Sequence, residues 1–289
     1  MKQIKRLTSF LKANLPGLYR TVFSLHFRVQ SLMQTPRYLF CILSKRPYLG
    51  PLMLSAQTWP TRAPYMKEAI ASLLRKEGRK ESFNVLEIGS WAGQSAILWA
   101  KSMREHQCDG HVFCVDSWQP FASPENIGIN TTTTLMSTIA RRDKIFPLFW
   151  HNVSSAGFAR TIIPLRGKSN DVLRILHPRS FDLVFVDGSH AYSDFLNDLI
   201  LASPLVKEGG ILCGDDLEMQ LDDIDQDYAE AHCERDFITD PKTGGDFHPG
   251  VCLGISRFFK RRILSCHDGF WMQMKSGEQW TDVKLLKNA

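Results

Sequence analysis

The sequence predicts an α/β protein with a Rossmann-like, doubly wound sheet that is mostly parallel. Two short runs, LVFV at 183–186 and GGILCG at 209–214, are almost entirely apolar, as expected for parallel strands covered by helices on both faces. Between them, apolar side chains recur at helical spacing over residues 192–200. A strand, a helix and a second strand in this order form a right-handed crossover, so we expect the two strands to be parallel.

Length and charge indicate one large domain with appendages. The chain has 289 residues, of which 44% are hydrophobic, enough for a sizeable core. Its net charge is +5, but residues 1–66 contain ten Lys or Arg and no Asp or Glu, which leaves 25 basic and 30 acidic residues, a net charge of −5, for the rest. We do not expect a nucleic-acid substrate, because the body is acidic and the basic charge is remote from it in sequence.

The cysteines and apolar runs indicate where the protein resides. Seven cysteines, an odd number without a C-x-x-C pair, favour reduced thiols in a cytosol-like compartment. No apolar run approaches the roughly 18 to 20 residues of a membrane-spanning helix, and the pattern of a secretory signal is missing. We therefore expect a cytoplasmic protein, with peripheral membrane contact as an alternative.

Residues 1–46 are predicted to form a basic, amphipathic helical arm, and residues 47–80 a proline-rich linker with a lead-in helix at 66–76. The arm divides at Pro16-Gly17 into two short helices. One face of the second is apolar: Leu18, Val22, Leu25, Val29 and Leu32. Three roles stay open for the arm, namely packing on the body or on a second subunit, contact with anionic lipid, and an organellar transit peptide.

A glycine-rich turn follows the strand predicted at 84–88. Gly89 and Gly93 allow a tight turn and a close approach of a ligand to the backbone, and the next helix points its positive end there. The spacing is E-x-G-x-x-x-G, which differs from the G-x-G-x-x-G of dinucleotide-binding folds. Asp116 ends the next strand, 27 residues after Gly89, where an acid can accept hydrogen bonds from ribose hydroxyls.

Three acids follow the two apolar strands. Asp187 comes after the first, and Asp215 and Asp216 come after the second. Because parallel strands end at the same edge of a sheet, we expect these carboxylates to converge where open α/β sheets bind ligands. Without a positive partner they would repel one another, so we expect a bound cation or raised pKa values. Oxygen ligands favour a hard ion such as Mg²⁺.

These motifs resemble the class I S-adenosylmethionine-dependent methyltransferases. The resemblance rests on VLEIGSWAGQSA, CVDSW, RGKSNDVL, FDLVFVDGSHAY with GDD, and HPGV, and it covers about residues 81–275. Within the family, the sequence is most similar to the group that contains macrocin O-methyltransferase and proteins labelled cephalosporin hydroxylase. The resemblance implies an antiparallel last strand and a methyltransferase domain at 81–289. We expect its acidic insert, at about 218–247, to be a solvated helix or a lid over the substrate.

The resemblance also implies a set of residues that bind S-adenosylmethionine. The turn is expected to contact the methionine part, Asp116 the ribose, and Trp118 with 167–170 the adenine. Core packing is an alternative for Trp118, and Ser169 is an alternative N-cap for a helix at 170–176. The full expected set is Glu87, Gly89, Ser90, Gly93, Ser95, Asp116, Ser117, Trp118, Ser169, Asn170 and Asp187.

Methyl transfer to a hydroxyl oxygen of high pKa needs a proton acceptor and a Lewis acid. His190, three residues after Asp187, is the first candidate for the acceptor, and His248 is the second. Alternatively, His190 only begins a helix. In catechol-type relatives, the resemblance places a lysine at His190, and Mg²⁺ on an Asp at position 187 and an Asp-Asn pair at 215–216. The expected metal ligands here are Asp187, Asp215 and Asp216.

Together these features predict an S-adenosylmethionine-dependent, divalent-metal-assisted O-methyltransferase that acts on a hydroxyl of a small molecule or a sugar. Two alternatives remain open from the sequence. One is a nicotinamide-dependent oxidoreductase on a similar sheet, which the glycine spacing disfavours. The other is a non-catalytic domain that the basic arm recruits to a membrane or a partner. Whether the protein forms a homo-oligomer stays open from the sequence.

Overall fold

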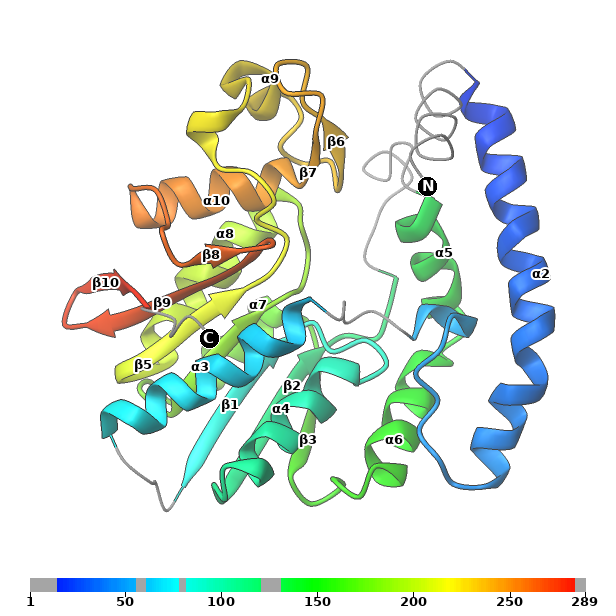
Figure 1. Ribbon diagram of the computed structural model, residues 1–289, viewed down its shortest axis with the longest axis horizontal. Coiled ribbons are helices and arrows are strands. Elements are labelled where there is room, and N and C mark those ends of the chain that lie inside the picture. Colours follow the sequence, from blue (N-terminus) through cyan, green and yellow to red (C-terminus); the bar gives the residue numbers. More distant parts are fainter. Residues whose placement is uncertain (1–14, 56–60, 78–81, 121–130, 284–289) are drawn as a thin grey trace.

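The sheet at the centre of the molecule is mostly parallel. The computed structural model describes residues 15–55, 61–77, 82–120 and 131–283. Strands β1 to β5 are parallel, in the order β5-β4-β1-β2-β3. Strand β9 pairs with β5 in the antiparallel direction, and both β10 and the short β8 pair with β9. Figure 1 shows this sheet with helices on both faces. The strands are β1 (Phe83–Ile88), β2 (Gly110–Asp116), β3 (Ile162–Arg166), β4 (Phe181–Val186), β5 (Val206–Gly214), β8 (Cys266–His267), β9 (Phe270–Ser276) and β10 (Gln279–Asp282).

Two layers of helices bury the two faces of the sheet. Every residue of β4 is buried, and its side chains alternate between the layers, with Leu183 and Phe185 in one core and Val184 and Val186 in the other. The first core contains side chains from α3 (Arg62–Glu77), α4 (Gln94–Glu105), α5 (Thr131–Ala140) and α6 (Ile145–Ser155). The second contains side chains from α7 (Ser169–Val172), α8 (Tyr192–Ala202) and α10 (Pro249–Phe259). The predicted doubly wound fold is therefore confirmed.

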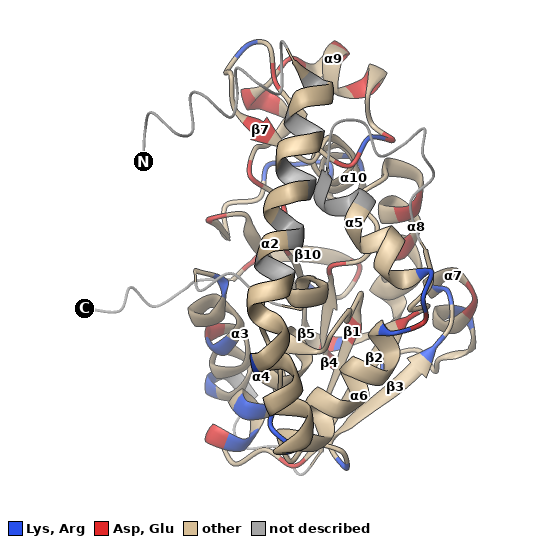
Figure 2. Cartoon of the chain, turned by 90° about the vertical axis from the view of Figure 1, so that its right-hand side faces the viewer, with Lys and Arg blue, Asp and Glu red and all other residues tan. Residues whose placement is uncertain are grey.

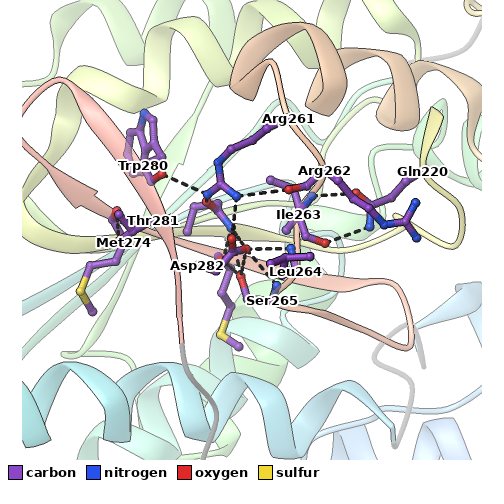
Figure 3. Close-up of polar contacts among 12 residues, drawn as sticks. Gln220, Arg261, Arg262, Ile263, Leu264, Ser265, Met274, Trp280, Thr281 and Asp282 are labelled. Atoms are coloured by element: carbon purple, nitrogen blue, oxygen red, sulfur yellow. Dashed lines mark hydrogen bonds and ion pairs between the residues drawn. The ribbon is translucent and has the colours of Figure 1, made fainter. Parts of the chain in front are cut away.

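The antiparallel end of the sheet is fastened by Asp282. Its carboxylate accepts hydrogen bonds from the backbone amides of Leu264 (2.8 Å) and Ser265 (2.9 Å) and from the side chains of Arg261 (2.6 Å) and Gln273 (2.7 Å), as Figure 3 shows. Burial alone would raise the pKa of Asp282, but these bonds lower it to about 2. The expected antiparallel last strand is present as β9, and the structure adds the two-residue β8 and the strand β10, which was not expected.

The described part of the arm is one long helix, α2 (Pro16–Leu43). It begins at Pro16, as the predicted break requires, but it continues through Pro36, so the expectation of a short second helix was wrong. The first predicted helix of the arm lies outside the described residues. Figure 1 shows α2 at one side of the molecule, beyond α5 and α6. None of the described helices has the length and apolar character needed to cross a membrane.

The acidic insert has a small structure of its own. It contains η4 (Leu221–Asp223), α9 (Gln226–Ala231) and a hairpin of β6 (Ile238–Thr239) and β7 (Asp246–Phe247). Its apolar side chains form a third core with α10: Ile224, Ala229, Ile238, Phe247, Cys252 and Leu253. The insert is thus more than the expected solvated helix, and it is packed against the body.

Candidate active site

The three predicted acids meet around one guanidinium group. Asp187 follows β4 and Asp215 follows β5, and the last residues of these strands, Val186 and Gly214, are paired. Arg62, at the start of α3, forms an ion pair with the Asp215 carboxylate, and its Nη1 lies 3.2 Å from Asp187 Oδ2. Its Nη2 lies 3.9 Å from Asp216 Oδ1. The Arg62 side chain is only 8% exposed, so this is a buried charge cluster.

Arg62 corrects the expectation that the acids lack a positive partner. It lies 125 residues before Asp187, and sequence reasoning overlooked it. One signal was present, because Arg62 is the only charged residue in the proline-rich stretch 47–65. Burial raises the pKa of Asp187, and the nearby Asp216 charge adds to this effect, although Arg62 opposes both. The raised pKa of Asp187 thus agrees with the expectation, the positive partner is an arginine side chain, and a bound metal cation stays a prediction.

His190 lies between two carboxylates. Its Nε2 is 3.1 Å from Asp216 Oδ2, and its Nδ1 is 2.7 Å from Asp236 Oδ1. Burial alone would lower the pKa of His190, but the charges and hydrogen bonds of Asp216 and Asp236 outweigh it and hold the pKa well above its usual value. For Asp216, burial acts to raise the pKa, whereas His248, His190 and Arg62 lower it below its usual value.

The second predicted histidine lies beside the first. His248 precedes α10 as its N-cap residue, and its ring centroid is 4.4 Å from that of His190. Its Nδ1 is 2.9 Å from Glu218 Oε1 and 4.0 Å from Asp216 Oδ1. The structure therefore brings together both histidines and all three acids that the sequence analysis selected. The alternative that His190 only starts a helix does not describe these contacts.

Asp236 and Glu218 are site residues that sequence reasoning missed. Both belong to the acidic insert, which we expected to be a solvated helix or a lid. Each instead holds the Nδ1 atom of one histidine of the site. Glu218 could have been noticed because it follows the GDD motif after one residue, whereas no sequence signal pointed to Asp236.

Several combinations of the described residues have the chemistry of a metal site. Their ligand atoms lie within 4.8 Å of one another in three groups: Asp187, His190 and Asp216; Asp216, Glu218 and His248; and His190, Asp236 and His248. Asp215 is in none of these groups. Because Arg62 pairs with all three predicted ligands, a cation at Asp187, Asp215 and Asp216 requires this guanidinium to move.

The glycine-rich turn touches the acid cluster. Gly89 has φ of 87°, and a Cβ atom there would lie 2.0 Å from the carbonyl oxygen of Asp187. Gly93, with φ of 83°, is the N-cap residue of α4, and the buried Ser95 lies in the first turn of that helix. The expected binding site for the cofactor's methionine part is therefore next to Asp187.

Asp116 stabilises this turn. Its Oδ2 accepts hydrogen bonds from the amides of Ser90 (3.0 Å) and Trp91 (2.9 Å), and its Oδ1 accepts one from the amide of Trp118 (2.6 Å). Ser117 lies between these contacts, with its hydroxyl accepting a bond from the Gln119 amide (3.2 Å). A carboxylate has about four acceptor positions, so Asp116 keeps room for about one ligand hydroxyl, not the two of a ribose.

Glu87 lies beneath the turn and is completely buried. Its polar neighbours include the Ser90 and Ser95 side chains, which lower its pKa but do not reach ideal hydrogen-bond geometry within the described residues. Burial raises the pKa of Glu87 to about 8, so the group is mostly protonated at neutral pH. A neutral acid here supports the turn without adding charge to the site.

The residues expected near adenine differ in exposure: Trp118 is buried, Ser169 is partly buried and Asn170 is exposed. Trp118 is 1% exposed, donates from Nε1 to the Trp91 carbonyl (2.7 Å) and packs on Phe146 and Phe149, as the core-packing alternative describes. Ser169 is the first residue of α7, and Lys168 occupies the cap position without a side-chain bond, so the N-cap alternative for Ser169 was wrong. Asn170 is exposed, and its Oδ1 accepts bonds from Arg174 and Asn197. Adenine contact stays a prediction for all three.

Comparisons with known proteins agree with this fold. Residues 86–217 match a family described as "Methyltransferase domain". The O-methyltransferase NovP superposes with a TM-score of 0.50 at 15% identity, over 75% of this chain and 80% of NovP. Two further structures resemble the chain more distantly. TomG from Streptomyces achromogenes has a TM-score of 0.44 at 18% identity, over 74% of this chain and 80% of TomG. PaMTH1 from Podospora anserina has a TM-score of 0.43 at 16% identity, over 97% of this chain and 96% of PaMTH1.

No curated protein sequence matches the chain. The family match spans β1 to the residue after the GDD motif, and it therefore includes the turn, Asp116, Asp187, His190 and the acid pair. The NovP superposition independently gives the same sheet architecture. Residues 86–217 thus match a family of methyltransferase domains, and the NovP superposition shows that the chain shares the fold of that O-methyltransferase.

Proposed function

We propose that the protein transfers the methyl group of S-adenosylmethionine to a hydroxyl oxygen of a small molecule or a sugar. The contact between Gly89 and the Asp187 carbonyl supports this most directly. It makes the turn that would hold the methyl donor continuous with the loop that contains Asp187 and His190. A donor on the turn and an acceptor beside His190 would thus meet at one point, as an in-line displacement requires.

In this proposal the cofactor lies along the carboxyl edge of β1, β2 and β4. The Gly89–Gly93 turn and the start of α4 would hold the methionine part, because their backbone conformation allows close approach. Asp116 would accept one ribose hydroxyl with its remaining acceptor capacity. TomG, whose fold is similar, was solved in complex with this cofactor.

His190 is the proposed proton acceptor. Bound S-adenosylmethionine would supply an electrophilic methyl group on its sulfonium sulfur, and the acceptor oxygen would have to face that carbon in line with the carbon–sulfur bond. For this step His190 must be neutral, with Nε2 released from Asp216, and the proton of the acceptor hydroxyl would then pass to Nε2. Asp236 fixes the ring through Nδ1 (2.7 Å) and stabilises the imidazolium that forms. His248 is a second candidate, because its ring lies 4.4 Å from that of His190.

We further propose that a divalent cation such as Mg²⁺ assists the reaction at Asp187, Asp215 and Asp216. The donor chemistry fits a hard cation, since three carboxylates converge there. When bound, such a cation would lower the pKa of the acceptor hydroxyl. Arg62 already supplies one positive charge to these groups, so the cation would have to displace it.

The proposed setting is a cytosol-like compartment with a small-molecule acceptor and no nucleic-acid substrate. No disulfide bond joins any two of the seven cysteines, all of which lie within the described residues, and this is compatible with a reducing environment. Five acidic side chains surround the site, which disfavours a nucleic-acid substrate: Asp187, Asp215, Asp216, Glu218 and Asp236.

The proposal is tested by calorimetric titration of the purified protein with S-adenosylmethionine and with its demethylated product. We expect both to bind, with a dissociation constant in the micromolar range. NADH serves as the control for the oxidoreductase alternative. Binding of NADH without binding of S-adenosylmethionine or its demethylated product would reject the proposal. If the cofactor binds, hydroxylated sugars and catechol-like compounds are the acceptors to screen first.

A further inference from the structure

The helix α2 exposes a continuous stripe of large apolar side chains. Those described along it are between 47% and 83% exposed: Leu18, Val22, Leu25, Val29, Leu32, Leu39 and Leu43. Isolated apolar side chains are normal on a protein surface, but a stripe of this length is not. Figure 2 shows α2 in front of the body along its whole length, with this helix as the outermost element of that side.

The stripe has the spacing of a coiled-coil seam. Leucines occur every seven residues, at 18, 25, 32 and 39, and the positions between them are Val22, Val29, Pro36 and Leu43. Apolar residues follow one another in alternating steps of four and three over 18–32, which is the heptad pattern with leucine at d, and Pro36 interrupts the a positions after that. Met33 (73% exposed) and Phe40 (57% exposed) occupy e positions and extend the apolar surface on one side of the seam.

The helix is attached to the body by the opposite face. Tyr48 donates from its hydroxyl to Gln34 Oε1 (3.4 Å), and the rings of Tyr38 and Tyr48 meet edge to face at 5.3 Å. Cys41 is buried in the main core. Gln34, Tyr38 and Cys41 occupy heptad positions f, c and f, which point away from a and d. The attachment therefore holds the seam outward.

We propose that α2 pairs with α2 of a second copy of this chain in a parallel, two-stranded coiled coil. Valine at a with leucine at d favours two parallel strands. Residues 18–32 form the regular part of the seam. Pro36 takes an a position and removes one helical hydrogen bond, so pairing is expected to weaken beyond it.

A lipid surface fits the helix less well than a second copy does. Helices that lie on anionic membranes combine a broad apolar face with many basic residues on the polar face. Over residues 16–43, α2 has three basic residues, Arg20, Arg28 and Arg37, and no acidic one. Of these, only Arg28 flanks the seam, at a g position, so like-charge repulsion between two parallel copies is small.

The test is the mass of the full chain in solution, by sedimentation equilibrium over a range of concentrations. We expect a dimer for the wild type and a monomer for the double variant Leu25→Glu, Leu32→Glu. Glutamate has nearly the helix propensity of leucine, so α2 should stay helical, which circular dichroism checks. The matched control is Ile175→Glu, an equally exposed apolar residue away from α2, which should remain dimeric.

The orientation is tested by disulfide formation under oxidation in Val29→Cys, an a position that meets its own copy only in a parallel pair. Arg37→Cys, at an outward b position, is the control. A wild type that is monomeric at all concentrations would overturn the proposal, as would a dimer that the double variant leaves intact. Sedimentation of a monomeric wild type with phosphatidylserine vesicles, lost in the double variant, would overturn it in favour of lipid binding.

Discussion

The active-site edge has a turn half, made of the Gly89–Gly93 turn and Asp116, and an acid half, made of Asp187, Asp215 and Asp216. The two halves hold their acids by different means. In the turn half, Asp116 is held by three backbone amides, two of them from the turn that follows β1. In the acid half, Asp187 and Asp216 are held by side chains, namely Arg62, His190 and His248. The turn half is therefore fixed by local backbone geometry, and the acid half by charges from distant segments. Substitutions should affect the turn half through stability and the acid half through chemistry and ion binding.

The largest effect on chemistry is expected at His190. His190→Ala removes the proposed proton acceptor and should lower turnover about 10²–10⁴-fold, with little change in cofactor affinity. His248→Ala is the matched comparison, because that ring is adjacent but bonded to Glu218. Turnover is measured with an acceptor found by screening the wild type, and cofactor affinity by calorimetry. A loss below tenfold in His190→Ala, with a larger one in His248→Ala, would assign the proton acceptor to His248.

The turn half should instead respond to a single methyl group at Gly89. In Gly89→Ala, the added Cβ meets the Asp187 carbonyl at 2.0 Å and the backbone stays at positive φ. We expect a loss of about 2–5 kcal/mol in the free energy of unfolding, from the left-handed backbone and the overpacking together. Gly157→Ala is the control, since φ there is also positive (79°) but no atom lies within 4 Å of the added Cβ. It should lose only about 1–2 kcal/mol in urea denaturation, and equal losses in the two variants would contradict the close approach.

Glu87 makes the stability of the turn half depend on pH. Its pKa is about 8 in the folded protein and 4.5 at its ordinary value, so the folded state binds the extra proton between these values. The contribution of this proton to the free energy of unfolding is fully present below the ordinary pKa. It is lost as the pH rises toward 8, and about 3 kcal/mol of it is gone at pH 7. Glu87→Gln cannot titrate, so its stability relative to the wild type should increase from pH 5 to pH 8 in thermal unfolding of the cofactor-free protein. A constant difference across this range would show that Glu87 is not protonated in the folded state.

The same contrast explains what the sequence could predict. The β1 turn, Asp116 and the acids after β4 and β5 are set by strand ends and glycine spacing, which are local patterns, and the structure has them where expected. Arg62, Asp236 and Glu218 reach the site only through tertiary packing of α3 and the insert. A heptad pattern is equally local, but the sequence does not show which face of α2 the body covers. The length of that helix was missed because an internal proline normally ends one.

The smallest expected effect, at Arg62, decides how the acid half is neutralised. In Arg62→Gln the three carboxylates lose their internal cation, so a divalent ion no longer has to displace a guanidinium from them. We expect the affinity for Mn²⁺, measured by electron paramagnetic resonance of the free ion, to rise about tenfold, equivalent to about 1.4 kcal/mol. Arg75→Gln, on the same helix but paired with Glu68, is the control and should leave the affinity unchanged. An unchanged affinity in Arg62→Gln would mean that the ion binds elsewhere, for example at the His248 and Glu218 pair, and Arg62 would then be a permanent partner of the acids.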